Sequence, residues 1–199
     1  MSDFDTRHLI TFNSSYTLPF GKGQAFASKA GHATDLLLGG WRLAGLSRWS
    51  SGLPFSIGEG GYTTDWEIGS YSVKTSNLKA QTVTNAVTHY PNAFANAAAI
   101  TSSTTTGGPL IRLPYPGEAG QRNAYRGDGY FDVDASLSKP FAITEKQIVR
   151  FTWEVFNVSN SVRFDTRGLT TNPTSGSFGN YSTTLTTARR MQFSLRYAF

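Results

Sequence analysis

The sequence predicts an all-β protein, and three features carry this prediction. Apolar and polar side chains alternate with a period of two in several segments, as in a strand with two chemically different faces. The 20 glycines and the 14% of aromatic residues favour strands and turns over helices. No run of about eighteen apolar residues is present, so the sequence excludes a transmembrane helix.

Five segments carry the alternation, and each has at least the roughly 9 to 11 residues with which a tilted strand crosses a bilayer. We expect these strands at about residues 8–20, 41–56, 130–141, 146–158 and 188–199. In the last segment every second residue is apolar, and the series ends on an aromatic residue: Met191, Phe193, Leu195, Tyr197 and Phe199. Such a final strand is typical of outer-membrane β-barrels. The sequence therefore predicts an antiparallel transmembrane β-barrel segment of about five strands.

The connections between the strands differ in length. The turn around 142–145 is short, whereas the loops 57–129 and 159–187 are long, as expected for periplasmic turns and extracellular loops. The connection 21–40 is longer than a periplasmic turn, and Thr34–Leu38 within it is expected to be helical. Aromatic girdles are expected at the two ends of the strands, formed by Phe20, Trp41, Phe141, Tyr197 and Phe199 and by Trp49, Tyr130, Phe131 and Phe156.

Composition and motifs argue against several classes of function. Without cysteine the chain has no disulfide, thiolate metal site or cysteine nucleophile. His8, His32 and His89 are far apart and lie in no HExxH motif, and no GxSxG motif is present. Asp132 and Asp134 are interpreted as solvated or ion-paired charges and not as a catalytic pair. The net charge of +5 is spread along the chain, so we expect no nucleic-acid partner. Because these catalytic and metal-binding motifs are missing from the sequence, we also expect no enzyme activity and no cofactor.

The alternation alone leaves different architectures open. A membrane β-barrel exposes its apolar face to lipid, whereas a soluble β-sandwich buries that face between two sheets. The sandwich would be a binding module, with carbohydrate as one ligand class, and would shield Phe12, Trp153 and Leu195 in its interior. A third interpretation is a small porin-like or adhesin-like barrel formed by several copies of the chain.

Six stretches occur in an order and at spacings that carry a resemblance: DTRHLITFNSSYTLPFGKG, LLLGGWRLAGLSRWSSGLPF, YPNAFANAAA, GEAGQRNAYRGDGYFDVDASLSKPF, EKQIVRFTWEVFNVSN and ARRMQFSLRYAF. In this order they resemble the C-terminal part of the Oar-like β-barrel of TonB-dependent outer-membrane transporters. The resemblance implies a barrel of about 22 strands with a plug in its lumen. It also implies energised passage of a large solute through the bacterial cell outer membrane. The implied partners are outer-membrane lipid, the TonB system through the plug, and the outer-membrane assembly machinery.

The sequence departs from the whole transporter by what it lacks. It shows no signal peptide, plug domain, energy-coupling box or carboxypeptidase-regulatory-like N-terminal domain. Five strands are also fewer than the about eight of the smallest barrels. We therefore expect residues 1–199 to be a C-terminal fragment of a longer precursor, and we expect the isolated sheet to aggregate in water.

Eight charged residues are expected on the face opposite the apolar one, where they would line the lumen: Arg42, Arg48, Asp132, Asp134, Arg150, Glu154, Arg190 and Arg196. They are candidates for contact with the plug, with a passing solute or with one another. Among them, Asp134 and Arg150 are expected to lie opposite each other or one diagonal step apart, and to form an ion pair.

Two further sets of residues are candidates for recognition. Phe193, Tyr197 and Phe199 resemble the signal that the outer-membrane assembly machinery reads, and the alternative is an ordinary edge strand. The long loop contains scattered aromatic residues, which favour either solute capture, carbohydrate included, or packing over the barrel mouth. These aromatic residues are Trp66, Tyr71, Tyr90, Phe94 and Tyr115.

Overall fold

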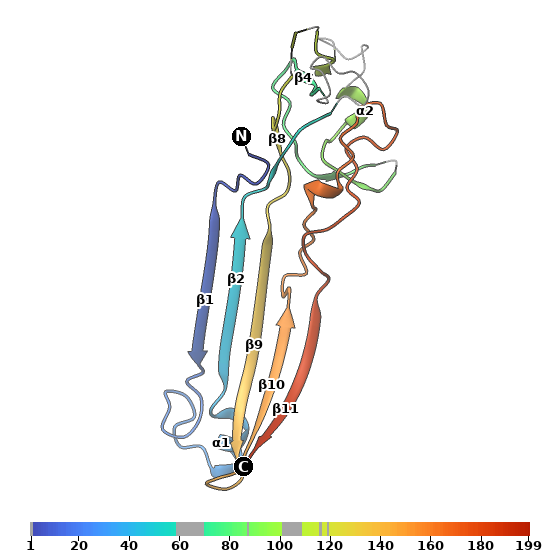
Figure 1. The fold of residues 1–199 in the computed structure, drawn as a ribbon. Coiled ribbons are helices and arrows are strands. Elements are labelled where there is room, and N and C mark those ends of the chain that lie inside the picture. The colour runs from blue at the N-terminus through green and yellow to red at the C-terminus, as the bar shows by residue number, and fades with distance from the viewer. Residues whose placement is uncertain (1, 59–69, 87, 101–108, 116, 119) are drawn as a thin grey trace. The chain divides into compact units, whose positions relative to one another are not determined.

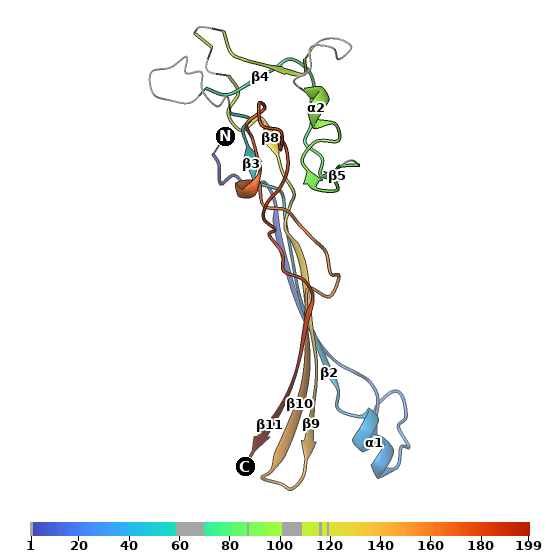
Figure 2. The ribbon, with the colours of Figure 1, turned by 90° about the vertical axis from the view of Figure 1, so that its right-hand side faces the viewer.

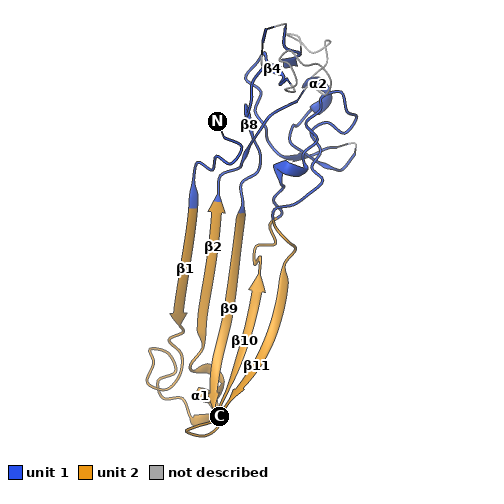
Figure 3. Cartoon of the chain, in the orientation of Figure 1, with its two compact units in different colours: residues 1–9, 50–130, 162–185 blue, residues 10–49, 131–161, 186–199 orange. Residues whose placement is uncertain are grey.

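The computed structural model describes residues 2–58, 70–86, 88–100, 109–115, 117–118 and 120–199 (Figure 1). Trp66 lies outside these described residues. The chain divides into two compact units. The first, here called the loop unit, comprises residues 1–9, 50–130 and 162–185, and the second, the sheet unit, comprises residues 10–49, 131–161 and 186–199 (Figure 3).

The sheet unit is one antiparallel sheet of five strands in the order β1-β2-β9-β10-β11 (Figure 1). The strands are β1 (Leu9–Thr17), β2 (Arg42–Ser50), β9 (Phe131–Ala142), β10 (Ile148–Phe156) and β11 (Arg190–Ala198). They fall on the five ranges that the alternation marks in the sequence. Turned by 90°, β2, β9, β10 and β11 lie in a single layer (Figure 2). The predicted all-β, antiparallel fold class is confirmed.

The register of the sheet gathers the alternating side chains onto two faces. Leu43 pairs with Leu137, Leu137 with Trp153, and Trp153 with Phe193. Because directly paired residues point to the same side, the odd-numbered residues of β2, β9, β10 and β11 form one face, the apolar face. Their even-numbered residues form the other, the polar face.

Strand β1 follows the same division with its parity reversed. The Leu18 amide donates to the Trp41 carbonyl at 2.8 Å. A Cβ atom added at Gly45 would lie 3.4 Å from the Ser14 Oγ. Both relations place the even-numbered residues of β1, Phe12 among them, beside the odd-numbered residues of β2, on the apolar face.

Among the described residues, no second sheet packs on the apolar face of this sheet. Phe12 is 62% exposed and Leu195 is 74% exposed, while Trp153 is half-buried. The Trp153 and Phe193 rings stack at 6.0 Å between centroids, so these side chains contact their neighbours within one layer. A sandwich would bury them against an opposing sheet. The interpretation as a soluble β-sandwich is therefore wrong for this sheet.

The connection between β1 and β2 carries the helix α1 (His32–Leu38), which contains the short helical piece expected at Thr34–Leu38. The Gly39 amide donates to the Asp35 carbonyl at 2.8 Å and closes the last turn of the helix. The Trp41 indole Nε1 donates to the Leu37 carbonyl at 2.8 Å. The end of α1 is thereby fixed to the start of β2.

Lys139 lies on the apolar face and is only 3% exposed. Its ammonium donates to the carbonyl of Gly39, and at 3.4 Å to that of Asp35, so the last carbonyls of α1 cover it. The rings of Trp41 and Phe141 lie 5.6 and 5.2 Å from the ammonium, within the range of cation–π contacts. A charged side chain in an apolar row is thus satisfied by a helix C-terminus and two aromatic rings.

The loop unit has a hydrophobic core of its own. Three two-stranded ladders frame it: β3 (Pro54–Phe55) with β8 (Tyr125–Arg126), β4 (Val73–Lys74) with β7 (Ile111–Arg112), and β5 (Val83–Thr84) with β6 (Pro91–Asn92). The unit also contains α2 (Ala97–Ile100) and the 3₁₀ turn η1 (Thr166–Gly168). Its buried apolar residues are Phe55, Ile57, Ala93, Phe94, Ile100, Ile111, Tyr125, Leu169, Phe178 and Tyr181.

The aromatic residues of the long loop divide into core and surface. Phe94 is 3% exposed, and its ring centroid lies 5.7 Å from that of Tyr125 and 5.6 Å from that of Phe178. Tyr71 is half-buried, whereas Tyr90 and Tyr115 are 61% and 63% exposed. Packing accounts for Phe94, whereas Tyr90 and Tyr115 lie at the surface of the loop unit.

Ion pairs and burial set the charge states in the loop unit. Hydrogen bonds from Arg112, which lies 2.6 Å from the Glu118 carboxylate, lower the pKa of Glu118 to about 2. Burial raises the pKa of Tyr125 to about 12. The pair therefore stays ionised, and the tyrosine neutral, throughout the ordinary pH range.

Truncation of the central aromatic residue tests the core of the loop unit. Phe94→Ala removes a ring packed among three others, and we expect it to destabilise this unit by about 3–5 kcal/mol. The control Tyr90→Ala removes an exposed ring and is expected to stay within roughly 0.5 kcal/mol of the wild type. Denaturant midpoints of the detergent-solubilised protein measure both changes, and coincident midpoints of the two variants would contradict the assigned core.

Removal of the buried ammonium tests how α1 is held. Lys139→Met keeps the length of the side chain but leaves the Gly39 carbonyl without its ammonium donor. We expect a local loss of about 1–3 kcal/mol. Limited proteolysis should show faster cleavage within residues 21–40, with the strands intact. The control Lys146→Met alters an exposed lysine of the β9–β10 turn and is expected to leave cleavage unchanged. Unchanged cleavage in Lys139→Met as well would refute this role.

Candidate functional site on the polar face

The register places all eight charged candidates on the polar face. Arg42 pairs with Ser138, and Arg48 pairs with Asp132 across β2 and β9. The remaining pairs are Asp134 with Leu46, Arg150 with Arg196, Glu154 with Gln192 and Arg190 with Phe156. One side of a single sheet therefore carries five arginines and three carboxylates, drawn from four strands.

The expected ion pair between Asp134 and Arg150 is wrong. Arg150 pairs with Pro140, so the two charges are separated by six positions along β9, or about 20 Å. The turn accounts for half of this separation, because a turn at 142–145 would place Arg150 opposite Leu137. β9 instead continues to Ala142 and the loop comprises residues 143–147, which moves Arg150 a further three positions away, to Pro140. The Asp134 carboxylate instead accepts a 3.0 Å hydrogen bond from the Asn157 amide just after β10.

The charges are sorted along the polar face. Asp134 and Glu154 lie near the middle of the strands, and Glu154 accepts a hydrogen bond from Gln192. They border a hollow of about 430 Å³. Its lining consists of Asn13, Ala44, Gly45, Leu46, Asp134, Ala135, Ser136, Glu154 and Phe156. The carboxylates are thus concentrated away from the end of the sheet that carries the β9–β10 turn.

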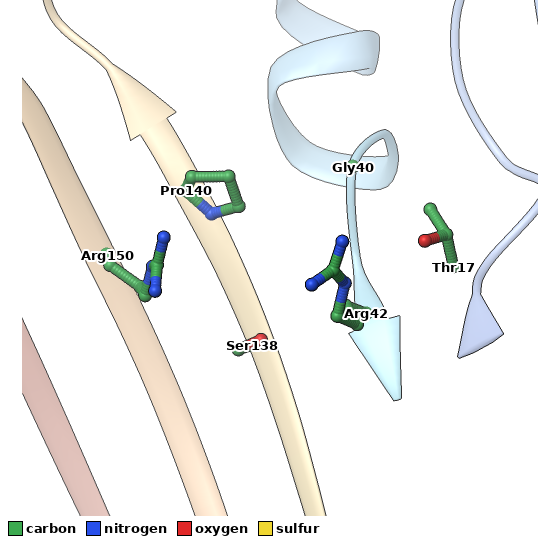
Figure 4. A pocket seen from close by; sticks show the side chains of 6 residues that line it. All are labelled: Thr17, Gly40, Arg42, Ser138, Pro140 and Arg150. Atoms are coloured by element: carbon green, nitrogen blue, oxygen red, sulfur yellow. The ribbon is translucent and has the colours of Figure 1, made fainter. Parts of the chain in front are cut away.

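At the end with the β9–β10 turn, here called the turn end, the charged strand residues on this face are the arginines Arg42, Arg150 and Arg196. A hollow of about 180 Å³ is lined there by Thr17, Gly40, Arg42, Ser138, Pro140 and Arg150 (Figure 4). Figure 4 shows the guanidinium groups of Arg42 and Arg150 on either side of Pro140. Arg196 extends the cluster on β11, directly opposite Arg150. None of the ion pairs found among the described residues includes these three arginines.

The proposed assembly signal lies at the end of β11. Phe193 faces the apolar side and stacks on Trp153, and Tyr197 pairs with Val149 on the same face. Phe199 follows the last residue of the strand and is 93% exposed, with its ring 5.7 Å from that of Tyr197. Its aromatic surface is accessible to a partner.

Four of the residues expected in the aromatic girdles lie on the apolar face toward the ends of the strands. Trp49 and Phe131 pair at one end of the apolar face, while Phe141 and Tyr197 lie toward the turn end. Phe156 was expected in the first of these girdles, but it pairs with Arg190 on the polar face. Its even number places it there, because β10 keeps a strict alternation up to its last residue.

Sequence reasoning missed Lys139. Its signal was present, because extending the alternation of β9 two residues beyond Leu137 puts a lysine in the apolar row. The carbonyl groups that accept from its ammonium lie at the C-terminal end of α1, 100 and 104 residues earlier in the chain, and no local pattern reveals them.

Metal and helical membrane sites find no support among the residues that the structure describes. No group of three or more histidine, aspartate or glutamate side chains is placed to hold a metal ion there. No helix in the described part of the chain is long and apolar enough to cross a membrane.

Comparisons with known proteins relate the chain to a protein family. No curated protein and no solved structure matches the chain. The family model described as an outer membrane beta barrel domain matches residues 1–192, which include four of the five long strands in full and the start of β11. The two opposed faces and the position of the strands agree with that description. The chain belongs to the outer membrane beta barrel domain family.

Proposed function

We propose that this chain forms part of the wall of a TonB-dependent, Oar-like outer-membrane receptor, which carries a large solute across the membrane with energy from TonB. In this proposal the apolar face contacts lipid and the polar face lines the lumen. The observation that carries it is the single-layered sheet, in which apolar side chains predominate on one face and all eight charged candidates lie on the other.

The energetic cost of placing a charged side chain in lipid indicates which face of the sheet would contact lipid and which would line the lumen. An arginine on the lipid side of a barrel costs about 2–4 kcal/mol near the bilayer midplane. Five arginines on the polar face therefore rule out lipid contact for that side in a membrane-embedded barrel. The exposed side chains of the apolar face, such as Phe193 and Leu195, gain from the same transfer.

The edges of the sheet favour a wall over a closed small barrel. β1 and β11 are the outer strands, and every residue of both is exposed. Strand edges with unpaired backbone groups are satisfied in a membrane by further strands of the same barrel. The TonB-specific part of the proposal rests on the resemblance of six stretches to the Oar-like family, and it assigns the plug and the energy-coupling segment to a longer precursor.

Contact with TonB tests the energised function. We expect formaldehyde treatment of intact cells to cross-link the full-length protein to TonB, and we expect this cross-link to vanish when the energy-coupling segment of the precursor is deleted. An established TonB-dependent receptor of the same cells serves as the positive control. Absence of the cross-link, with the control receptor linked, would contradict the TonB-dependent assignment.

The C-terminal aromatic residues are proposed as the signal for the assembly machinery. Deleting Phe199 from the full-length protein is expected to lower the amount of assembled, heat-modifiable barrel several-fold while synthesis stays constant. Tyr115→Ala, which removes an exposed aromatic side chain of the loop unit, is the matched control and should assemble normally. Normal assembly without Phe199 would refute the signal.

A further inference from the structure

The arrangement of Arg42, Arg150 and Arg196 at the turn end is costly without an anion. Arg150 and Arg196 are direct partners on neighbouring antiparallel strands, so their Cα atoms lie about 5 Å apart. Like charges in directly opposed positions destabilise a sheet. The nearest carboxylate along the same strand, Glu154, is four residues from Arg150, or about 13 Å away.

The hollow beside these arginines leaves room for an oxyanion between two guanidinium groups. β9 separates β2 from β10, so the backbones that carry Arg42 and Arg150 lie roughly 10 Å apart. Between them β9 contributes the small Ser138 and Pro140, which leaves the space of about 180 Å³ open. Figure 4 shows both guanidinium groups directed toward this space. Guanidinium groups bind carboxylate and phosphate groups with paired hydrogen bonds.

We propose that this hollow is a binding site for a polyanion, with one oxyanion group bridging Arg150 and Arg196 and a second reaching Arg42. The ligand class is a di- or tricarboxylate or a phosphorylated compound. Such groups arise from two sources, a small solute in the lumen or acidic side chains from another part of the assembled protein. This proposal requires only that the polar face be accessible to water. It does not depend on whether the protein is TonB-dependent.

Citrate binding to the membrane-assembled protein, extracted in nonionic detergent and dialysed free of multivalent anions, tests the site. Calorimetric titration should give saturable binding at constant ionic strength. The double variant Arg150→Gln and Arg196→Gln should bind citrate at least about tenfold more weakly, because charge-assisted hydrogen bonds are lost. Arg122→Gln is the control and should bind like the wild type, since Arg122 belongs to the loop unit and is ion-paired with Asp3 at 2.6 Å.

Thermal unfolding of the same proteins without added anion distinguishes the two sources. If acidic side chains of the assembled protein fill the site, citrate will not bind, and the double variant will melt below both the wild type and Arg122→Gln. If a free solute is the ligand, citrate will bind as described, and the double variant will melt no lower than the wild type in anion-free buffer. Citrate binding that survives in the double variant would overturn the proposal. So would an absence of binding together with a double variant that is no less stable, because the arginines would then merely repel each other.

Discussion

The structure depends on the register of its strand pairs. Each of the ladders β2–β9, β9–β10 and β10–β11 pairs odd-numbered residues with odd-numbered ones, so the alternation of every strand adds to the same two faces. A slip of one residue at any ladder would move a whole set of apolar side chains to the polar side. The two faces therefore exist only because the turns and connections hold this parity throughout.

That constraint explains why so much of the sheet follows from the sequence. The positions of the five strands need only the period of two within each strand. The shared face of the eight charges needs one further assumption, that the apolar sides of all strands coincide. Predicting whether Asp134 and Arg150 form a pair requires more information, because the answer depends on the register between β9 and β10. Placing the turn at 142–145 instead of 143–147 is a small error in sequence, yet it misassigns every pair across β9 and β10.

The loop unit could not be predicted in the same way. Its core joins Phe94 to Phe178 and Phe55 to Tyr125, contacts that connect segments far apart in the chain. Its strands are two residues long, too short to show a period. The role of Lys139 could not be predicted for the same reason, because its charge is satisfied by the end of a helix that is distant in the sequence. Local patterns thus account for the membrane-spanning part, and long-range packing accounts for the rest.

The charged residues of the polar face are distributed unequally along the strands. Asp134 and Glu154 lie near the middle of the strands, while Arg42, Arg150 and Arg196 gather at the turn end. A lumen lined in this way presents a solute with successive regions of opposite charge, and a low-dielectric wall strengthens the field of each region. The sequence alone shows the charges, and the register is what orders them.

Cysteine accessibility on adjacent residues of β9 tests the central claim, that one face meets lipid and the other meets water, most directly. The chain contains no cysteine, so Ser136→Cys and Ala135→Cys each introduce a single thiol into it, on the polar and on the apolar face respectively. In intact outer membranes with no other reactive thiol in the protein, a membrane-impermeant maleimide should label Ser136→Cys readily and Ala135→Cys only after unfolding. Equal labelling of both positions, or preferential labelling of Ala135→Cys, would contradict the assignment of the two faces.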